Sequence, residues 1–282
     1  MINTFLNFKT KNIVSQSFDL EEIQSANKVL FSLFTRYGDT IIDLVAIEEF
    51  IELYPNKEYL VLCPRQMKPY VNELLPDIDC ISLNKRNLFD MLKVNHVLKK
   101  WCPDVGFNPW SNGLDSCYFL TYCKKYLCYK DFKRPKIINH YQVVRRYLNL
   151  PEKDWNINKL ILKDNYRKIL ICPQSTDPKR SMPHLQMDEL ITNLKQKYKG
   201  VRIIIASMDN SFFREGTEQF IFEKSLNSSE KFIRLFKDTD LAICTDSAPL
   251  HIASALGKDL IAIFHITKPE IVINQNTTLL VS

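Results

Sequence analysis

Three short polar segments hold the residue types that could bind or transfer a charged group. The first is Thr245–His251 (TDSAPLH), which lies between a predicted strand and a predicted helix. Backbone N–H groups at a helix start, together with the helix dipole, form a site for an anion such as phosphate. Asp246 or Ser247 is expected to cap that helix, and His251 could add a hydrogen bond. A plain capped loop with a packed histidine is the other interpretation.

The second segment, Pro173–Pro183 (PQSTDPKRSMP), also follows a predicted strand. The hydroxyls of Ser175 and Thr176 can donate to phosphate oxygens. The cations Lys179 and Arg180 can neutralise the charge of a diphosphate. Because both segments follow strands of a predicted parallel sheet, they are expected at the same edge of that sheet. The alternative is a polar surface loop without a ligand.

The third segment is Arg36–Asp39 (RYGD), which follows the first predicted strand. Gly38 permits a sharp turn and the close approach of a ligand. Asp39 then stands at the start of a helix. Its carboxylate could serve as a general base or merely cap that helix.

Alternating strands and helices must position these segments. A short helix is expected near Asp19–Asn27. Apolar runs and helical spacing then predict strands Lys28–Phe34, Tyr59–Cys63 and Asp79–Leu83, and helices Thr40–Tyr54 and Pro69–Leu75. Residues 85–150 mix aromatic, basic and Cys residues, and their periodicity gives no topology.

A second alternating set begins after Pro151. It comprises strands Lys168–Cys172, Val201–Ala206, Leu241–Cys244 and Asp259–Phe264, and helices Leu185–Tyr198, Ser228–Lys237 and Pro249–Leu256. Ser228 is the expected cap of its helix. The two sets predict two Rossmann-like α/β domains, over residues 1–150 and 151–282, that face each other across a cleft.

The composition narrows the class of protein. Apolar residues make up 45% and charged residues 25% of the 282, which excludes wholesale disorder. No apolar run approaches the roughly 18 residues of a membrane span, and Met1–Thr10 does not read as a secretory signal. The eight Cys form no C-x-x-C pair, so reduced thiols are expected rather than a metal site. We therefore expect a cytoplasmic protein.

The positive charge is concentrated in the middle of the chain. Residues 1–84 hold 7 basic and 12 acidic side chains (7 − 12 = −5), whereas residues 85–150 hold 13 and 4 (13 − 4 = +9). Such a block points to phosphate, an anionic lipid or nucleic acid, and no nucleic-acid-binding pattern is present. A solvated basic surface is the alternative. Aromatic residues in the same block could stack on sugar rings or pack in the core: Trp101, Trp110, Tyr118, Phe119 and Tyr122.

The three segments, in this order, resemble the signatures of the glycosyltransferase family 9 heptosyltransferases of bacterial lipopolysaccharide synthesis. The matching stretches are R-Y-G-D at 36–39, P-Q-S-T-D-P-K-R-S-M-P at 173–183 and D-S-A-P-L-H-I-A-S-A-L-G at 246–257. The last stretch is the most specific. The resemblance covers residues 28–83 and 165–265, and residues 85–150 match only loosely.

The resemblance implies a GT-B fold and an inverting sugar transfer that needs no metal or other cofactor. The donor would be a nucleotide-sugar, such as an ADP-linked heptose, and the acceptor a saccharide or lipid-linked sugar. Asp39 would be the catalytic base and Asp209 a contact to the nucleoside. The donor phosphates would be bound by Ser175, Thr176, Lys179, Arg180, Asp246, Ser247, Ala248 and His251.

The acceptor would bind to the first domain, which holds the basic block. The acceptor-side candidates are Arg36, Gly38, Lys124, Lys125, Arg145 and Arg146, and the wider basic set adds Lys130, Lys133, Arg134 and Lys136. These cations could also meet an anionic membrane at the inner face of the plasma membrane. Peripheral membrane contact is therefore a further expectation.

Two departures from the family pattern favour a different class of function. Ala248 stands where the family has Gly, and its Cβ would be strained at a positive φ. Only 18 residues follow Phe264, so the second domain is expected to be shortened. Both features favour the alternative of a degenerate, non-catalytic member that binds a nucleotide or glycan.

Overall fold

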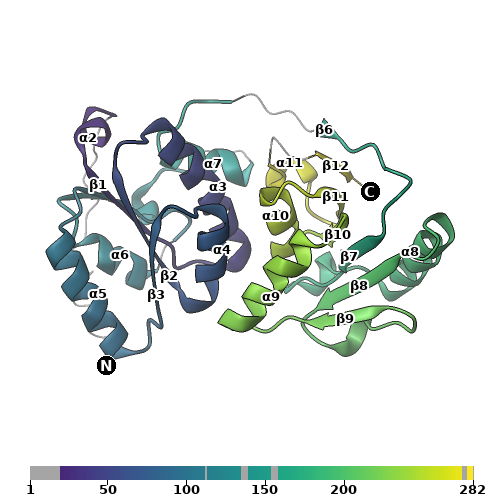
Figure 1. The fold of residues 1–282 in the computed structure, drawn as a ribbon. Coiled ribbons are helices and arrows are strands. Elements are labelled where there is room, and N and C mark those ends of the chain that lie inside the picture. The colour runs from purple at the N-terminus through teal and green to yellow at the C-terminus, as the bar shows by residue number, and fades with distance from the viewer. Residues whose placement is uncertain (1–19, 112, 135–138, 154–157, 275–277, 282) are drawn as a thin grey trace. The chain divides into compact units, whose positions relative to one another are not determined.

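The computed structural model describes residues 20–111, 113–134, 139–153, 158–274 and 278–281 (Figure 1). The chain divides into two compact units, residues 1–152 and 153–282. The division falls two residues after the boundary expected from the sequence. The predicted cleft between the domains stays a prediction.

The first unit is built on a five-stranded sheet in the order β3-β2-β1-β4-β5, and all neighbouring strands are parallel. The strands are β1 (Lys28–Ser32), β2 (Glu58–Pro64), β3 (Asp79–Leu83), β4 (Val105–Phe107) and β5 (Lys125–Leu127). β1 lies between β2 and β4, so the strand order changes direction there. Parallel sheets bind ligands beyond the carboxyl ends of their strands at such a switch point. The loops after β1 and β4 both leave the sheet at that position.

Helices cover the sheet of the first unit (Figure 1). They are α2 (Leu20–Ser25), α3 (Tyr37–Leu53), α4 (Lys68–Leu74), α5 (Leu88–Trp101), α6 (Leu114–Leu120) and α7 (His140–Tyr147). α3 begins three residues before the predicted start, so Tyr37, Gly38 and Asp39 form its first turn, and Gly38 does not have a positive φ. The prediction of a turn before the helix is wrong because the apolar spacing begins only at Ile41.

The described residues of the block 85–150 contribute three α-helices and two very short strands to the first unit. Tyr118 and Phe119 are buried in its hydrophobic core, and the partly buried Trp101 and Tyr122 pack against the same core. Core packing is therefore confirmed for these four aromatic side chains. Trp110 lies elsewhere, in the loop after β4.

The second unit holds a seven-stranded parallel sheet in the order β6-β12-β11-β10-β7-β8-β9. Its strands are β6 (Asn158–Lys159), β7 (Lys168–Cys172), β8 (Arg202–Ser207), β9 (Glu218–Ile221), β10 (Leu241–Thr245), β11 (Asp259–Ile263) and β12 (Thr278–Val281). Its helices are α8 (His184–Lys197), α9 (Leu226–Lys237), α10 (Ala248–Ala255) and α11 (Pro269–Val272). The switch point of this sheet is β7, which lies between β8 and β10.

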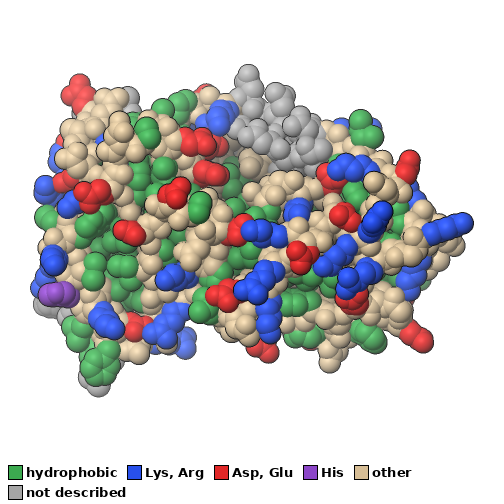
Figure 2. Space-filling model, viewed as in Figure 1, with side chains coloured by type: hydrophobic (Ala, Val, Ile, Leu, Met, Phe, Trp, Pro, Cys, Tyr) green, Lys and Arg blue, Asp and Glu red, His purple; other side chains and the backbone are tan. Residues whose placement is uncertain are grey.

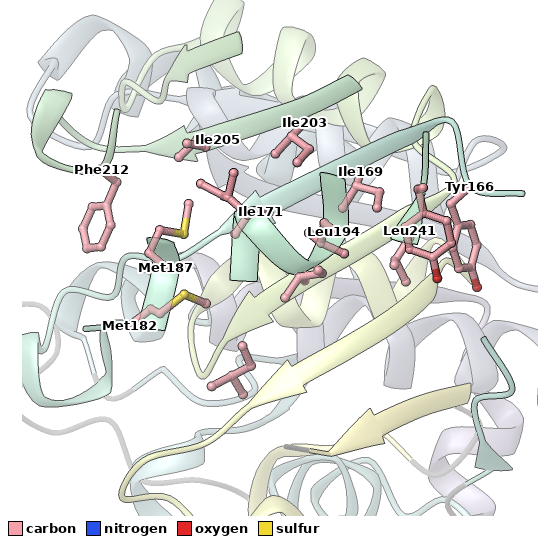
Figure 3. Close-up of a cluster of buried hydrophobic side chains, with 14 of the residues drawn as sticks. Tyr166, Ile169, Ile171, Met182, Met187, Leu194, Ile203, Ile205, Phe212 and Leu241 are labelled. Carbon is pink, nitrogen blue, oxygen red and sulfur yellow. The ribbon is translucent and has the colours of Figure 1, made fainter. Parts of the chain in front are cut away.

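The core of the second unit fixes one of the candidate loops. Ile169 and Ile171 of β7 pack in one buried cluster with Met187 of α8 and with Met182, near the end of the loop 173–183 (Figure 3). The backbone N–H of Met182 also donates to the carbonyl of Pro173 over 2.8 Å. The loop is therefore closed at its base while its polar middle faces outward.

The predicted cap of α9 is wrong. α9 begins at Leu226, and the hydroxyl of Ser225 accepts from the N–H of Ser228 at 3.2 Å. The Ser228 hydroxyl instead accepts from the N–H of Glu223 at 2.9 Å. A segment with several serines offers more than one cap, and the apolar pattern does not choose between them.

All eight cysteines are free, and six of them are buried. Within the described ranges, no group of three or more His, Cys, Asp or Glu side chains could hold a metal ion. Among the helices that the structure describes, none is long and apolar enough to span a membrane.

Candidate functional site

Two of the predicted loops meet at the switch point of the second sheet. β7 and β10 are parallel neighbours with Cys172 beside Cys244, so the loops that follow them leave the same edge. The Ser175 hydroxyl donates to the backbone carbonyl of Asp246 at 3.4 Å. Arg180 Nη1 donates to Asp246 Oδ2 at 3.3 Å. The structure thus brings together residues that lie 71 and 66 positions apart in the sequence.

Asp246 is the centre of this site but does not cap α10. Its buried carboxylate accepts from Arg180 and from the hydroxyl of Thr267 at 2.5 Å. The N-cap is Ser247, which makes no side-chain capping bond; its hydroxyl donates to the Thr245 carbonyl at 3.3 Å. The predicted side-chain cap is therefore wrong. Since a carboxylate repels phosphate, we infer that Asp246 acts by holding Arg180 in place.

The first turn of α10 has an ordinary helical backbone. Ala248 is not among the residues with positive φ, so the strain predicted for its Cβ is absent. Pro249 follows it and brings no N–H group, while the N–H of Leu250 donates to the Ser247 carbonyl at 3.0 Å. His251 is buried in the same turn of the helix. Ala248 therefore gives less support to a degenerate, non-catalytic member than the sequence indicated.

The middle of the loop 173–183 carries accessible cations. Pro178–Arg180 form a single 3-10 turn, capped by Asp177, which accepts from the N–H of Lys179 at 3.0 Å. Arg180 Nε lies 3.8 Å from an Asp177 oxygen, so this guanidinium stands between two carboxylates. The side chains of Thr176 and Lys179 are exposed. Lys179 and Thr176 are thus more exposed at this edge than Arg180, which is partly buried.

Gln174 joins this loop to the one that follows β8, and sequence reasoning missed its role. Its amide Nε2 donates to Asp209 at 2.9 Å and its Oε1 accepts from the N–H of Met208 at 2.6 Å. Hydrogen bonds from Ser211 and Gln174 lower the pKa of Asp209. The nucleoside candidate is thus an exposed, ionised carboxylate held at the same edge as the phosphate loops.

In the first unit, Asp39 lies in the first turn of α3, beyond the carboxyl end of β1. It is half-buried, and its Oδ2 accepts from the Thr35 hydroxyl at 3.4 Å. Arg36 is the exposed N-cap residue and makes no side-chain capping bond. A carboxylate in this turn interacts favourably with the helix dipole. Arg36, Gly38 and Asp39 therefore lie together at the carboxyl edge of the first sheet, in the unit predicted to bind the acceptor.

The loop after β4 is fixed to the loop after β5 by the buried side chain of Asn108. Its Oδ1 accepts from the N–H of Tyr129 at 2.8 Å, and its Nδ2 donates to the Ser116 hydroxyl at 3.0 Å. The Tyr147 hydroxyl in turn accepts from the Asn108 N–H at 2.9 Å. This network was not predicted. An Asn directly after a strand is the signal that could have suggested it.

Trp110, two residues after Asn108, gathers aromatic and cationic partners at this edge. It has a positive φ of 49°. Its ring centroid lies 5.3 Å from that of Tyr129, and the Arg134 guanidinium carbon lies 4.7 Å from it. Burial raises the pKa of Tyr129 to about 12; Arg134 opposes this shift and Asp39 adds to it. Tyr129 is therefore within electrostatic range of both Arg134 and Asp39.

Other predicted acceptor-side cations lie apart from this cluster. Lys124 and Lys125 stand at the start of β5, the edge opposite Asp39, where they pair with Asp104 (2.7 Å) and Glu22 respectively.

The two arginines of α7 are committed to other partners as well. Arg145 is buried and paired with Glu49 of α3, and the exposed Arg146 pairs with Glu152 at 2.9 Å. The structure does not bring these four cations to Asp39. A run of basic residues does not itself specify which edge of a sheet each one reaches.

Asp43, one helical turn after Asp39, is fully buried. Neither of its carboxyl oxygens has a hydrogen-bond partner among the residues that the structure describes. Burial raises the pKa of Asp43 well above its ordinary value, and the Asp39 carboxylate raises it further. Asp43 also adds to the raised pKa of Tyr129 and of Tyr147, so Asp39 and both tyrosines lie within electrostatic range of it. A neutral Asp43 would leave Asp39 as the charged member of the pair.

We expect the free energy of unfolding of the wild type to fall, relative to that of Asp43→Asn, as pH rises from about 4 toward the raised pKa. The folded protein keeps the Asp43 proton in this window, whereas the unfolded chain releases it. Each pH unit then favours the unfolded state by about 1.4 kcal/mol. Urea denaturation of both proteins at about pH 5 and about pH 7 measures the difference. Parallel stability curves would mean that Asp43 ionises normally when folded.

Comparisons with known proteins show similarity in sequence family and in fold. Residues 140–278 match the family Glycosyltransferase family 9 (heptosyltransferase). No curated protein sequence matches the chain significantly.

Solved structures match over most of the chain. The structure of Escherichia coli heptosyltransferase WaaC with ADP has a TM-score of 0.65 and 12% identity, covering 90% of this chain and 93% of that one. E. coli ADP-heptose lps heptosyltransferase II has a TM-score of 0.69 and 14% identity, covering 90% of each chain. A glycosyl transferase family 9 structure from Veillonella parvula DSM 2008 has a TM-score of 0.64 and 13% identity. The match covers 92% of this chain and 87% of that one. The α/β fold is thus the GT-B type.

Proposed function

We propose that the chain is a glycosyltransferase of the family 9 (heptosyltransferase) type, which transfers heptose from an ADP-linked donor to a saccharide or lipid-linked acceptor. The observation that carries this proposal is the pair of loops joined at the β7 and β10 switch point, where Asp246 holds Arg180. The family signature in these loops, and the ADP and ADP-heptose named for two of the similar structures, support the choice of donor.

The leaving diphosphate needs compensating positive charge as its bond to the sugar breaks. Arg180 and Lys179 would stabilise it together with the N-terminus of α10. The Thr176 hydroxyl would donate to a phosphate oxygen. Arg180 is held by Asp246, and the N-terminus of α10 is fixed by the fold, so these two groups need little reorganisation during the reaction. We therefore propose a metal-independent transfer.

Asp39 would act as the general base on the acceptor. Its carboxylate would take the proton of an acceptor hydroxyl while that oxygen attacks the anomeric carbon. The bond from this carbon to the diphosphate oxygen breaks on the opposite face, so the configuration inverts. The buried neighbour Asp43 would remain protonated and leave Asp39 free to ionise.

The acceptor would bind over the loop after β4. Arg134, whose guanidinium lies over the Trp110 ring, offers an exposed cation for a phosphate or carboxylate on the acceptor sugar. Asp39, Trp110 and Tyr129 follow β1, β4 and β5 and so lie at the same edge of the sheet, which supports one acceptor site on this unit. An anionic sugar of the lipopolysaccharide type fits these groups.

Isothermal titration with ADP, UDP, GDP and CDP tests the donor, and a transfer assay with ADP-heptose tests the reaction. We expect ADP to bind at least about tenfold more tightly than the other diphosphates, since one good polar contact to the base is worth about that factor. Transfer should persist in a metal chelator. Equal binding of all four nucleotides, or a rate that falls with chelator and returns with Mg²⁺, would contradict the proposed donor or the metal independence.

A further inference from the structure

Helix α5 of the first unit exposes a compact group of large apolar side chains. Its inner face, with Met91, Val94 and Leu98, is buried in the core. At its start, Leu88, Phe89 and Leu92 are 56%, 79% and 55% exposed. These three residues are called here the α5 patch. Leu92 is a neighbour of both others on the helix surface, because it follows Phe89 by three positions and Leu88 by four. Phe89 is exposed in a way that the fold of this unit does not explain.

Cations surround the α5 patch. Lys85, Arg86 and Lys93 are exposed beside it, and Lys99 and Lys100 follow at the other end of the helix. Between residues 85 and 100 the sequence holds these five basic residues and one acid, Asp90, a net charge of +4 (5 − 1). Figure 2 shows hydrophobic side chains at the lower end of this helix with Lys and Arg side chains next to them.

The single acid does not offset this positive surface at the patch. The Asp90 carboxylate accepts from Arg65 Nη2 at 2.7 Å and from the N–H of Asn84 at 2.8 Å. Lys85 pairs with Asp115 at 2.5 Å, which leaves Arg86 and Lys93 as the exposed charges nearest the patch. A partner surface that matches this pattern must be apolar inside and negatively charged at its rim.

The α5 patch is held on a well-fixed helix start. The Asn87 side chain caps α5 and accepts from the N–H of Phe89 at 2.9 Å. The bond from Arg65 to Asp90 ties the segment after β2 to the first turn of α5. α5 follows β3, so its start lies at the carboxyl edge of the parallel sheet, the edge that also carries Asp39.

We propose that the α5 patch docks on an anionic lipid bilayer. Leu88, Phe89 and Leu92 would enter the boundary between headgroups and acyl chains, and Arg86 and Lys93 would meet lipid phosphates. Docking at this edge would bring the Asp39 side of the unit to a lipid-linked acceptor, a consequence that rests on the proposed function.

Sedimentation with vesicles tests the docking without any sugar nucleotide, so its result is independent of the proposed function. We expect the protein to bind vesicles of phosphatidylglycerol and phosphatidylethanolamine. Its binding to neutral phosphatidylcholine vesicles should be weaker, by at least about fivefold for each cation that contacts the anionic lipids. Phe89→Ser with Leu92→Ser should lower the partition coefficient at least about tenfold. Arg86→Gln with Lys93→Gln should lower it on anionic vesicles and leave binding to phosphatidylcholine unchanged.

The matched control is Leu185→Ser on α8 of the second unit. Leu185 is 72% exposed, and its replacement also exchanges a large apolar side chain for serine. It should bind vesicles like the wild type. Equal binding by the control and the Phe89–Leu92 variant would overturn the proposal. So would a wild type that ignores anionic vesicles but elutes as a dimer that Phe89→Ser converts to a monomer, because the patch would then be covered by a second copy.

Discussion

Replacement of Asp39 by Asn is expected to lower kcat/KM for sugar transfer by about 10³-fold, the usual range for loss of a general base. The amide keeps the size of the side chain but cannot take the acceptor proton at neutral pH. The hydrogen bond from Thr35 to this position can be kept by the amide oxygen, so the first turn of α3 should survive. Donor affinity should stay within a few-fold, since the donor loops belong to the other unit.

Glu52→Gln is the matched control for Asp39→Asn. Glu52 lies on the same helix, is exposed, and undergoes the same change from acid to amide. It should leave kcat/KM at the wild-type value. Transfer at the wild-type rate by Asp39→Asn would exclude Asp39 as the base, and equal losses of rate and donor affinity would mean that the substitution damages the fold.

Strands with an apolar run long enough to show a pattern could be predicted from the sequence. Strands too short to show a pattern were missed. KILIC at 168–172 and DCISL at 79–83 match β7 and β3 residue for residue. β4 and β5 have three residues each, too few to show periodicity, and they lie in the block 85–150 that gave no topology. α5 was hidden for another reason: the exposed Leu88, Phe89 and Leu92 break the amphipathic pattern of a helix against a core.

Candidate residues could be predicted from the loops, but their partners could not. The strand–loop–helix pattern was enough to place Arg180 and Asp246 at one sheet edge. That they bond to each other depends on β7 lying beside β10, a pairing between strands almost 70 residues apart. The contact from Gln174 to Asp209 likewise depends on β7 lying beside β8. Sheet order is decided by the packing of whole helices and strands, which no local pattern records.

Replacement of Arg180 by Ala should weaken binding of the donor nucleotide by about 10- to 100-fold, the value of a charge-assisted hydrogen bond to phosphate. The guanidinium is about a quarter exposed and stands between Asp246 and Asp177, so an incoming diphosphate can reach it. Loss of this cation also leaves the buried Asp246 carboxylate with only Thr267 as a side-chain donor among the described residues, so a cost in stability is expected. Isothermal titration with ADP, alongside urea denaturation, separates the two effects.

Arg180→Lys and Asp246→Asn distinguish charge from geometry at this site. If Arg180 binds phosphate directly and Asp246 only positions it, Arg180→Lys should recover part of the affinity, and Asp246→Asn should lose less affinity than Arg180→Ala. Arg202→Ala is the control: Arg202 makes two bonds to Glu218, at 2.8 and 3.0 Å, at the start of β8, away from the loops. The Arg202→Ala variant should bind ADP with the wild-type affinity. If Arg180→Ala loses stability but binds ADP like the wild type, Arg180 has a structural role and the diphosphate must bind elsewhere.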